Sequence, residues 1–452
     1  MSEQAVVQVG GIGKPPVQDL HVSIPDNVRL DYRRLAEFCW SRPSDIDVDL
    51  FYVAELVHQA DRVFQRRWAS TGWSRDLHLV VPVHAPEAWH GAENALSNCL
   101  SYLTGDDWSF TFEARGHRPE EPIQCELRAP LKSSPIVLPY SDGLDSFLAR
   151  HLLSDGTRPL VTVTAHHDTT LQVAEFGGST PVHHLKIPIS TRALGRRKRE
   201  KTCRSRTFLF FTISAIAGRL AGADSVHVPE GGIGCLGPSL VVTGDEWPHV
   251  GAHPHFATLL HQFLETLRQG GNPFPRFRFP FLWKTKGQTL REFLDVGGQS
   301  QDALTTNSCS ASAYRKRSGL PRRCGVCPGC MFTRVSMQEA GVGEPPKYFL
   351  WHDIAASHLE KSCSRREIDT VSANVEMAHR AVFNLACASR IDRTDLQRRW
   401  IHELRESIGE CDVEGAVVSL FEQFSKEWNS FLHRLPTSSW VRQVDRVAGV
   451  LP

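Results

Sequence analysis

The sequence predicts an α/β fold built around a parallel sheet, with an α+β region before the sheet and helices after it. Strand and helix signals alternate between about residues 131 and 345, a pattern typical of a parallel sheet covered by helices on both faces. A strand–turn–helix unit opens this stretch and a cluster of four cysteines closes it. We therefore expect an α+β accessory domain over residues 1–130, the parallel-sheet domain over 131–345 and a helical region over 346–452.

The N-terminal part mixes helical and extended patterns. Apolar residues recur at helical spacing over Ile46–Phe64, and period-two alternation predicts strands over Leu77–Val83 and Trp108–Ala114. A further helix is expected over Glu93–Leu103. Because no motif in this part carries recognisable chemistry, we expect it to be an accessory region.

The central part contains the alternation that predicts the parallel sheet. We expect strands over residues 136–140, 160–165, 182–189 and 225–228, and a long helix over 204–220. In such sheets, ligands bind beyond the carboxyl ends of the strands. The turn at Ser141–Ser146, the strand end at Thr164–His166 and the turn after Val228 therefore form one expected binding edge.

The C-terminal part has helical periodicity. We expect helices over Asp369–Ala388, Asp392–Glu406 and Val413–Leu432. The last carries an apolar stripe at helical spacing: Val417, Leu420, Phe421, Phe424, Trp428 and Phe431. Such a stripe favours packing in a core. An exposed face that docks a partner is the alternative.

Length and composition exclude several classes of protein. The 452 residues carry a formal net charge of +1, which gives no sign of wholesale nucleic-acid binding. The longest apolar stretch, Phe208–Ala217, is too short to span a membrane, and Met1–Gln4 lacks the features of a signal peptide. We expect a cytoplasmic protein that binds neither membrane nor nucleic acid.

The turn after the first central strand has the composition of a phosphate-binding loop. Small residues between a strand and a helix direct several backbone N–H groups to one point at the positive end of the helix dipole. Ser141 and Ser146 add hydroxyl groups, and Asp145 is a candidate magnesium ligand. No Walker A lysine follows. The predicted nucleotide-binding residues are Ser141, Asp142, Gly143, Leu144, Asp145 and Ser146, with Thr164 and His166 from the next strand end.

The four late cysteines have the spacing of a metal site. Cys309, Cys324, Cys327 and Cys330 follow a C-x14-C-x2-C-x2-C pattern, and four thiolates form a closed, structural zinc site. An iron–sulfur cluster is the alternative occupant. The other eight of the twelve cysteines are scattered, and we expect them to pack as small hydrophobic residues.

Basic residues gather before the long central helix. We expect Arg196–Lys201 to be a solvated face. Arg204 and Arg206 stand at the start of the helix, where a guanidinium group can reach a phosphate or a carboxylate. Farther along, we expect Lys284 and Lys286 to lie in a surface turn.

These motifs together resemble a known family. The loop is similar to the Ser-Gly-Gly-x-Asp-Ser loop of the PP-loop ATP pyrophosphatases, the adenine nucleotide alpha-hydrolase-like superfamily. With the arginine-rich helix start and the late cysteine cluster, residues 135–335 resemble the QueC family of 7-cyano-7-deazaguanine synthases. The additional N- and C-terminal regions make the chain more similar to the QatC-type proteins of bacterial anti-phage defence operons. Asp142 stands where the family usually has a glycine.

The resemblance implies an ATP-dependent ligase that uses magnesium and carries zinc. Such an enzyme adenylates the carboxylate of 7-carboxy-7-deazaguanine, releases pyrophosphate and passes the acyl group to ammonia or to an amine of a partner protein from the same operon. The implied catalytic residues are Asp145, Ser146, Arg204 and Arg206. Two alternatives stay open: a PP-loop enzyme that modifies tRNA, and a nucleotide-binding scaffold whose loop Asp142 has disabled.

Overall fold

The chain forms two compact units, each of which is described by itself. The structure, a computed structural model, describes residues 3–10, 18–24, 29–30, 41–66, 72–115, 131, 133–154, 156–166, 182–190, 200, 202–241, 246–268, 270–310, 323–363, 371–391, 401–409 and 412–449. The first unit comprises Met1–Tyr140, Leu153–Val228 and Gly244–Phe279. The second comprises Ser141–Leu152, Pro229–Thr243 and Pro280–Pro452.

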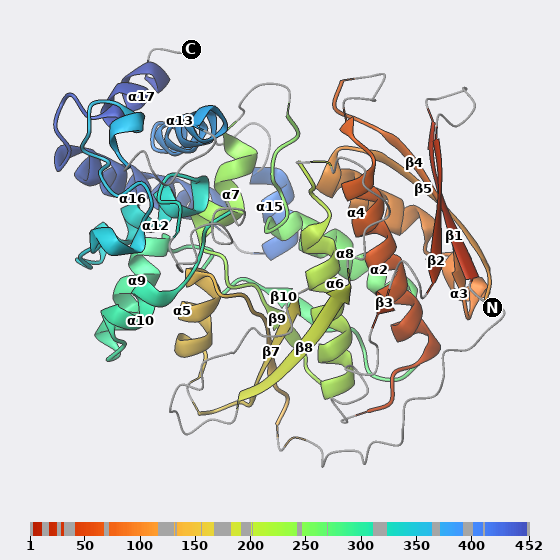
Figure 1. Cartoon of the computed structure of the whole chain (residues 1–452). Helices are drawn as coiled ribbons and strands as arrows, with labels where there is room; N and C mark the ends of the chain where they lie inside the picture. The colour runs from red at the N-terminus through yellow and green to blue at the C-terminus, as the bar shows by residue number, and fades with distance from the viewer. Residues whose placement is uncertain are drawn as a thin grey trace. The chain divides into compact units, whose positions relative to one another are not determined.

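A six-stranded sheet forms the centre of the first unit, in the order β10-β9-β6-β7-β8-β3 (Figure 1). Its strands are β3 (Arg29–Leu30), β6 (Ile136–Pro139), β7 (Leu160–His166), β8 (Val182–Ser190), β9 (Ser225–His227) and β10 (Arg276–Arg278). All neighbours pair in parallel except β3, which runs antiparallel to β8. The predicted α/β class with a parallel sheet is confirmed.

The order of the strands reverses at one point in this sheet. The chain moves outward from β6 through β7 to β8, then returns to place β9 on the other side of β6. An open α/β sheet binds its ligands at such a switch point, beyond the carboxyl ends of the two strands that flank it. Here these strands are β6 and β9, and the segments that follow them begin at Tyr140 and Val228.

A long apolar helix, α6 (Arg206–Ala221), packs on β6, β7 and β9. It is buried on nearly all sides, which explains why it has no polar face in the sequence. It ends at Gly222, whose φ of 70° favours glycine in the cap position.

The N-terminal region adds a four-stranded sheet, β2-β1-β4-β5, to the first unit. Its strands are β1 (Glu3–Gly10), β2 (Gln18–Ile24), β4 (Asp76–Val83) and β5 (Asp107–Ala114). Its helices are α2 (Asp45–Val63), α3 (Pro86–His90) and α4 (Glu93–Thr104).

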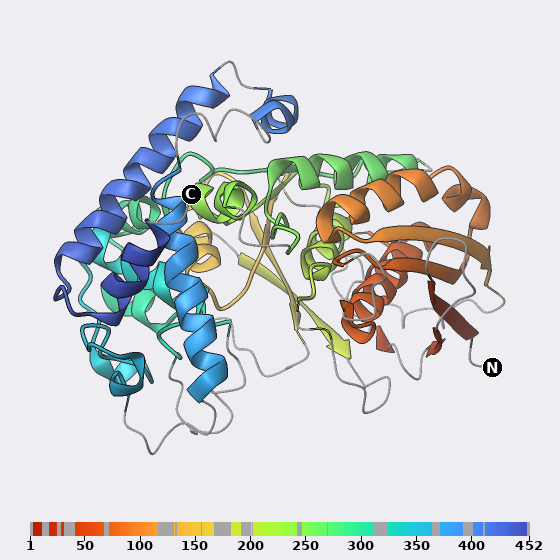
Figure 2. The same cartoon turned by 90° about the horizontal axis from the view of Figure 1, so that it is seen from above.

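Two helix pairs join this region to the parallel sheet. Helix α2 packs on α6, and α4 runs beside α8 (Pro254–Thr266), seen in Figure 2 as orange and green helices. One hydrophobic core therefore extends through both sheets. The first unit cuts across the predicted boundary near residue 130, and a separate accessory domain over 1–130 stays a prediction.

Most of the predicted elements are present, with bounds that differ by at most two residues at each end. The strands β4 to β9 and the helices α2, α4 and α6 are confirmed. The hairpin of β1 and β2 was not predicted, because its short polar and apolar runs give no clear period. The predicted helix over Asp392–Glu406 is described only from Ile401, and its earlier part lies outside the described residues.

The second unit is largely helical. Its helices are α5 (Leu144–Leu152), α7 (Gly232–Leu240), α9 (Lys286–Asp295), α10 (Ser300–Thr305), α12 (Pro328–Glu339), α13 (Val371–Ala388), α15 (Ile401–Ile408), α16 (Val413–His433) and α17 (Trp440–Ala448), with 3-10 turns η2 (Pro346–Tyr348) and η3 (Leu359–Lys361). One core lies between α5, α9, α10 and α12. The stripe of α16 is buried throughout, so the prediction that it packs in a core is confirmed.

Within the described ranges, no helix combines the length and the apolar character that crossing a membrane requires.

Candidate functional site

The predicted phosphate loop leads into α5 in the second unit, and serine hydroxyl groups surround its backbone. The N–H of Ser141 donates to Ser146 Oγ, and the N–H of Gly143 donates to Ser141 Oγ, both at 3.2 Å. The N–H of Leu144, in the first turn of α5, donates to Ser308 Oγ at 3.1 Å. The two loop serines also bond each other at 2.8 Å. The loop is thus a small ring of N–H and O–H groups at the positive end of a helix.

The Asp142 side chain is exposed, and an amide engages its carboxylate. Asn307 Nδ2 donates to Asp142 Oδ2 at 2.9 Å, and the Asn307 N–H donates to the Asp142 carbonyl at 2.6 Å. The carboxylate therefore has a neutral hydrogen-bond donor as its neighbour.

Asp145 forms an ion pair that we did not predict. Its Oδ2 lies 2.6 Å from Lys286 Nζ at the start of α9, and both side chains are largely buried. The Lys286 ammonium group also lies over the ring of Phe332, 4.5 Å from its centroid. Two α-helices of the second unit, α5 and α9, thus bring the acid and the base together.

Glu230 completes this charged group. It lies before α7, and its carboxylate folds against Gly234, where a Cβ would come within 2.0 Å of Glu230 Oε1. Burial and the nearby Asp145 carboxylate raise the pKa of Glu230 to about 7. Burial alone would lower the pKa of Lys286, but Asp145 and Glu230 raise it above the ordinary value. The lysine is therefore a protonated cation beside the loop, flanked by two acids.

The prediction that Lys286 lies in a surface turn is wrong. Lys286 is only 4% exposed, whereas the side chain of Lys284 is 40% exposed and pairs with Glu292. A capping box formed by Thr285 and Gln288 makes Lys286 the first residue of α9. A cation at the positive end of a helix is unfavourable and needs an anionic partner. That combination of cap and lysine is the sequence signal we missed.

A helix near the C-terminus supports the turn that holds Lys286. Thr285 Oγ1 donates to a carboxylate oxygen of Glu427, which lies on α16 and is 2% exposed. Burial raises the pKa of Glu427 to about 7. The helical C-terminal region therefore supports the candidate site from within the same unit.

The four predicted cysteines come together as a cluster that could hold a metal such as zinc. Their Sγ atoms all lie within 4.8 Å of one another. Cys324 and Cys330 are 3.8 Å apart, and Cys309 and Cys327 are 4.0 Å apart. Metal–sulfur bonds of about 2.3 Å in a tetrahedron place sulfur atoms about 3.8 Å apart, so the sulfur set fits a single tetrahedral ion.

The surroundings of the cluster suit sulfur atoms that carry negative charge. The N–H groups of Val326 and Cys327 point to Cys324 Sγ at 3.4 and 3.2 Å, and the N–H of Cys324 points to Cys309 Sγ at 3.4 Å. Hydrogen bonds among the thiols hold the pKa of Cys327 well below its usual range and raise those of Cys324 and Cys330, so the four thiols share their protons unequally. The donor set is thus suited to a cation.

Two buried arginines accompany the cluster. Arg323 and Arg334 are each 3% exposed, and both interact electrostatically with Cys330. Four thiolates around a divalent ion carry a net charge of −2, and two guanidinium groups offset that charge.

The other predicted site residues belong to the first unit. Thr164 is buried in β7 and donates its hydroxyl to the Tyr140 carbonyl at 2.8 Å. His166 ends β7, and its side chain lies outside the described part of the structure. Arg206 is exposed, with its guanidinium over the Phe210 ring. Their contact with a ligand at the loop stays a prediction.

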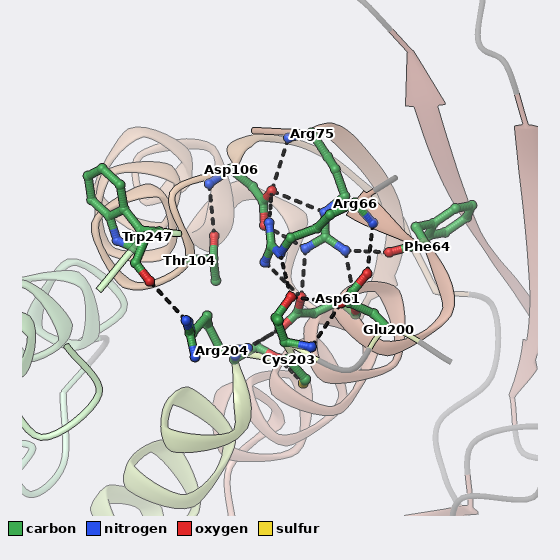
Figure 3. A network of polar contacts seen from close by, with 12 residues as sticks. Asp61, Phe64, Arg66, Arg75, Thr104, Asp106, Glu200, Cys203, Arg204 and Trp247 are labelled. Carbon is green, nitrogen blue, oxygen red and sulfur yellow. Dashed lines mark hydrogen bonds and ion pairs between the residues drawn. The ribbon is translucent and has the colours of Figure 1, made fainter. Parts of the chain in front are cut away.

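Arg204 belongs to a polar network that anchors the start of α6 (Figure 3). Its N–H donates to Asp61 Oδ2 at 2.8 Å, and its guanidinium donates to the Trp247 carbonyl at 2.9 Å. The same Asp61 carboxylate pairs with Arg66 and Arg75, which also pair with Asp106. This arrangement explains the arginine-rich helix start structurally. The basic stretch Arg196–Lys201 lies outside the described residues except for Glu200.

No protein-family model matches the chain, and neither a curated protein nor a solved structure matches it. What the site can do therefore has to follow from its own residues.

Proposed function

We propose that the protein binds the phosphates of ATP at Ser141–Ser146 and uses them to activate a carboxylate. The observation that carries this proposal is the buried Asp145–Lys286 pair at the start of α5. An ammonium group beside a ring of N–H and O–H donors suits a polyphosphate, and the adjoining carboxylate suits a magnesium ion.

A third charged residue of the second unit supports the same location. Asp145 and Glu230, which follow β6 and β9 along the chain, both interact electrostatically with Lys286.

For the four cysteines we propose zinc. Sulfur atoms 3.8 to 4.0 Å apart suit one ion at bond distances of about 2.3 Å. An iron–sulfur cluster would need room for several atoms between the thiolates. Four protein ligands leave no open position, so the zinc has a structural role.

The proposed reaction is carboxylate adenylation followed by transfer to an amine, as in the QueC family. A carboxylate oxygen of 7-carboxy-7-deazaguanine attacks the α-phosphorus of ATP, and the bond to the β-phosphate oxygen breaks. Pyrophosphate leaves with that electron pair. The amine nitrogen then attacks the acyl carbon, AMP leaves, and the amine loses its proton. The amine belongs to ammonia or to a partner protein of an anti-phage operon.

The residues have separate roles in this scheme. Lys286 and the loop donors stabilise the negative charge that develops on the leaving pyrophosphate. Asp145 would hold a magnesium ion, which would supply positive charge beside the phosphates. Because AMP and pyrophosphate are the leaving groups, the reaction needs no protein nucleophile.

The decisive experiment measures pyrophosphate release from ATP with and without 7-carboxy-7-deazaguanine. Parent protein, Asp145→Asn, Lys286→Met and the matched control Lys284→Met are compared. We expect release to require the acid and to fall by about 100-fold or more in the first two variants. Lys284→Met should match the parent, because its side chain is partly exposed and its described contacts are with Glu292 and the ring of Phe281.

Each of the single variants Asp145→Asn and Lys286→Met leaves the other residue as a buried charge without its partner. The folding of both variants is therefore checked by circular dichroism. The double variant Asp145→Asn/Lys286→Met removes both charges and should fold but release no pyrophosphate. Release at the parent rate from folded Lys286→Met would contradict the proposed site. ATP binding by the parent without release, whatever acid is offered, would contradict the ligase and favour the scaffold.

A further inference from the structure

A three-residue segment, Asn307–Cys309, links the cysteine cluster to the loop inside the second unit. Cys309 supplies one of the four sulfur atoms. The two residues before it make three hydrogen bonds with the loop segment. Asn307 bonds both the backbone carbonyl and the carboxylate of Asp142, and Ser308 Oγ accepts the N–H of Leu144.

The other side of this segment lies against the cysteine cluster. A Cβ at Gly329 would come within 1.9 Å of the Ser308 carbonyl oxygen, so only glycine permits this approach. Gly329 lies between Cys327 and Cys330 in the first turn of α12. The N–H of Ser310 also points to Cys327 Sγ at 3.4 Å. The segment is therefore held between the loop and the cluster.

The backbone makes this link stiff. Consecutive Cα atoms are about 3.8 Å apart, so an ion that fixes Cys309 also restricts Ser308 and Asn307. We propose that Asn307 and Ser308 are positioning residues through which metal binding holds the loop in its phosphate-binding shape. The link to ATP rests on the proposed function, whereas the link between metal and loop does not.

The coupling acts in both directions. If the bound metal favours the loop conformation that binds ATP, then ATP must raise the affinity for the metal by the same factor. Asn307 adds a second effect, because its amide engages the Asp142 carboxylate. In Asn307→Asp, two carboxylates would face each other and push the loop away from this position.

The first test is hydrogen exchange of the peptide 141–148 in zinc-loaded protein without nucleotide. Ser308→Ala and Asn307→Asp are compared with the parent and with Ser310→Ala. Among the described contacts, the Ser310 side chain makes none with the loop. We expect the first two variants to exchange about fivefold faster at Leu144 and its neighbours, the factor that corresponds to one hydrogen bond. Ser310→Ala should exchange like the parent. Equal exchange in all four proteins would overturn the proposal.

The second test measures zinc affinity by equilibrium competition with a chelator, with and without magnesium ATP. We expect ATP to raise the zinc affinity of the parent and of Ser310→Ala by at least about fivefold, and to raise that of Ser308→Ala by clearly less, because only the Asn307 contacts remain. An equal ATP effect in Ser308→Ala would overturn the coupling. If the parent binds no ATP, the proposed function fails, while the exchange experiment still decides whether Asn307 and Ser308 hold the loop in position.

Discussion

At the scale of single residues, the burial of Glu55 makes the stability of the protein depend on pH. Its side chain is fully buried in the middle of α2, where Gln59 Nε2 donates to one carboxylate oxygen at 2.6 Å. The other oxygen, Oε2, has no hydrogen-bond partner among the described residues. Burial raises the pKa of Glu55 to about 8. The folded protein therefore keeps a proton that the unfolded chain loses above its ordinary pKa of 4.5.

We expect Glu55→Gln to become more stabilising as the pH rises. Between pH 4.5 and 8 the unfolded state binds fewer protons than the folded state, so the parent loses stability with rising pH. The free energy of unfolding of the variant does not fall in this way. Its excess over that of the parent should therefore grow by at most about 1.4 kcal/mol per pH unit. Urea unfolding at pH 5, 6.5 and 8 measures the difference. Glu113→Gln, at an exposed position, is the control, and its stability relative to the parent should not change with pH in this way. A pH-independent difference for Glu55→Gln would contradict the assignment.

The sequence indicates the types of residue at the candidate site better than it indicates their burial. The loop and the four cysteines could be predicted because short spacing places their donors together. For Lys286 the only local signal is a lysine at the capped start of a helix, because its partners Asp145 and Phe332 are far away in the sequence. The polar segment around it suggested a solvated turn. Tertiary contacts decide whether such a charge is buried.

At the scale of elements, helical periodicity predicts α2 within a residue or two but not its surroundings. An amphipathic pattern suggests one face in water, yet Asp47, Glu55 and Asp61 are all buried. Asp47 pairs with Arg219, far along the chain, whereas Asp61 pairs with Arg66 and Arg75 in the segment that follows α2. Buried charges with distant partners have no local pattern, so the sequence alone cannot reveal them.

Asp61 connects α2 with the start of α6, and Asp61→Asn tests that connection. Arg75 lies 2.6 Å from Asp61 Oδ1, and the N–H groups of Arg204 and Ser205 each lie 2.8 Å from Asp61 Oδ2. Burial alone would raise the pKa of Asp61, but Arg75 and Arg66 hold it well below its usual range. Loss of this charge leaves buried guanidinium groups undercompensated, and we expect a cost of about 3–5 kcal/mol.

Chemical denaturation measures the free energy of unfolding for this comparison. Asp107→Asn is the matched control, since Asp107 is exposed and the described hydrogen bond of its side chain is with Ser74. Its free energy of unfolding should stay within about 0.5 kcal/mol of the parent. If both variants were equally stable, Asp61 would not be the connection between the two helices.

At the scale of the whole molecule, each compact unit has a hydrophobic core of its own. The larger core lies entirely in the first unit, whereas Leu144, Phe293 and Met337 belong to a core in the second. The cysteine cluster lies in the second unit, where α12 begins at the cluster and packs on α9, α13 and α16. A metal held by these cysteines therefore stabilises the second unit directly.

We expect metal removal to loosen the second unit while the first stays folded. After treatment with a chelator, amides of α9 and α12 should exchange faster, because the helices lose the ion that fixes the start of α12. Amides of α2 and β4, in the core of the first unit, should keep their protection. Hydrogen exchange followed by mass spectrometry reports both sets at once, and zinc in excess over the chelator is the control. Parallel loss of protection in α2 and α12 would mean that the two units unfold as one, and that the metal stabilises the entire chain.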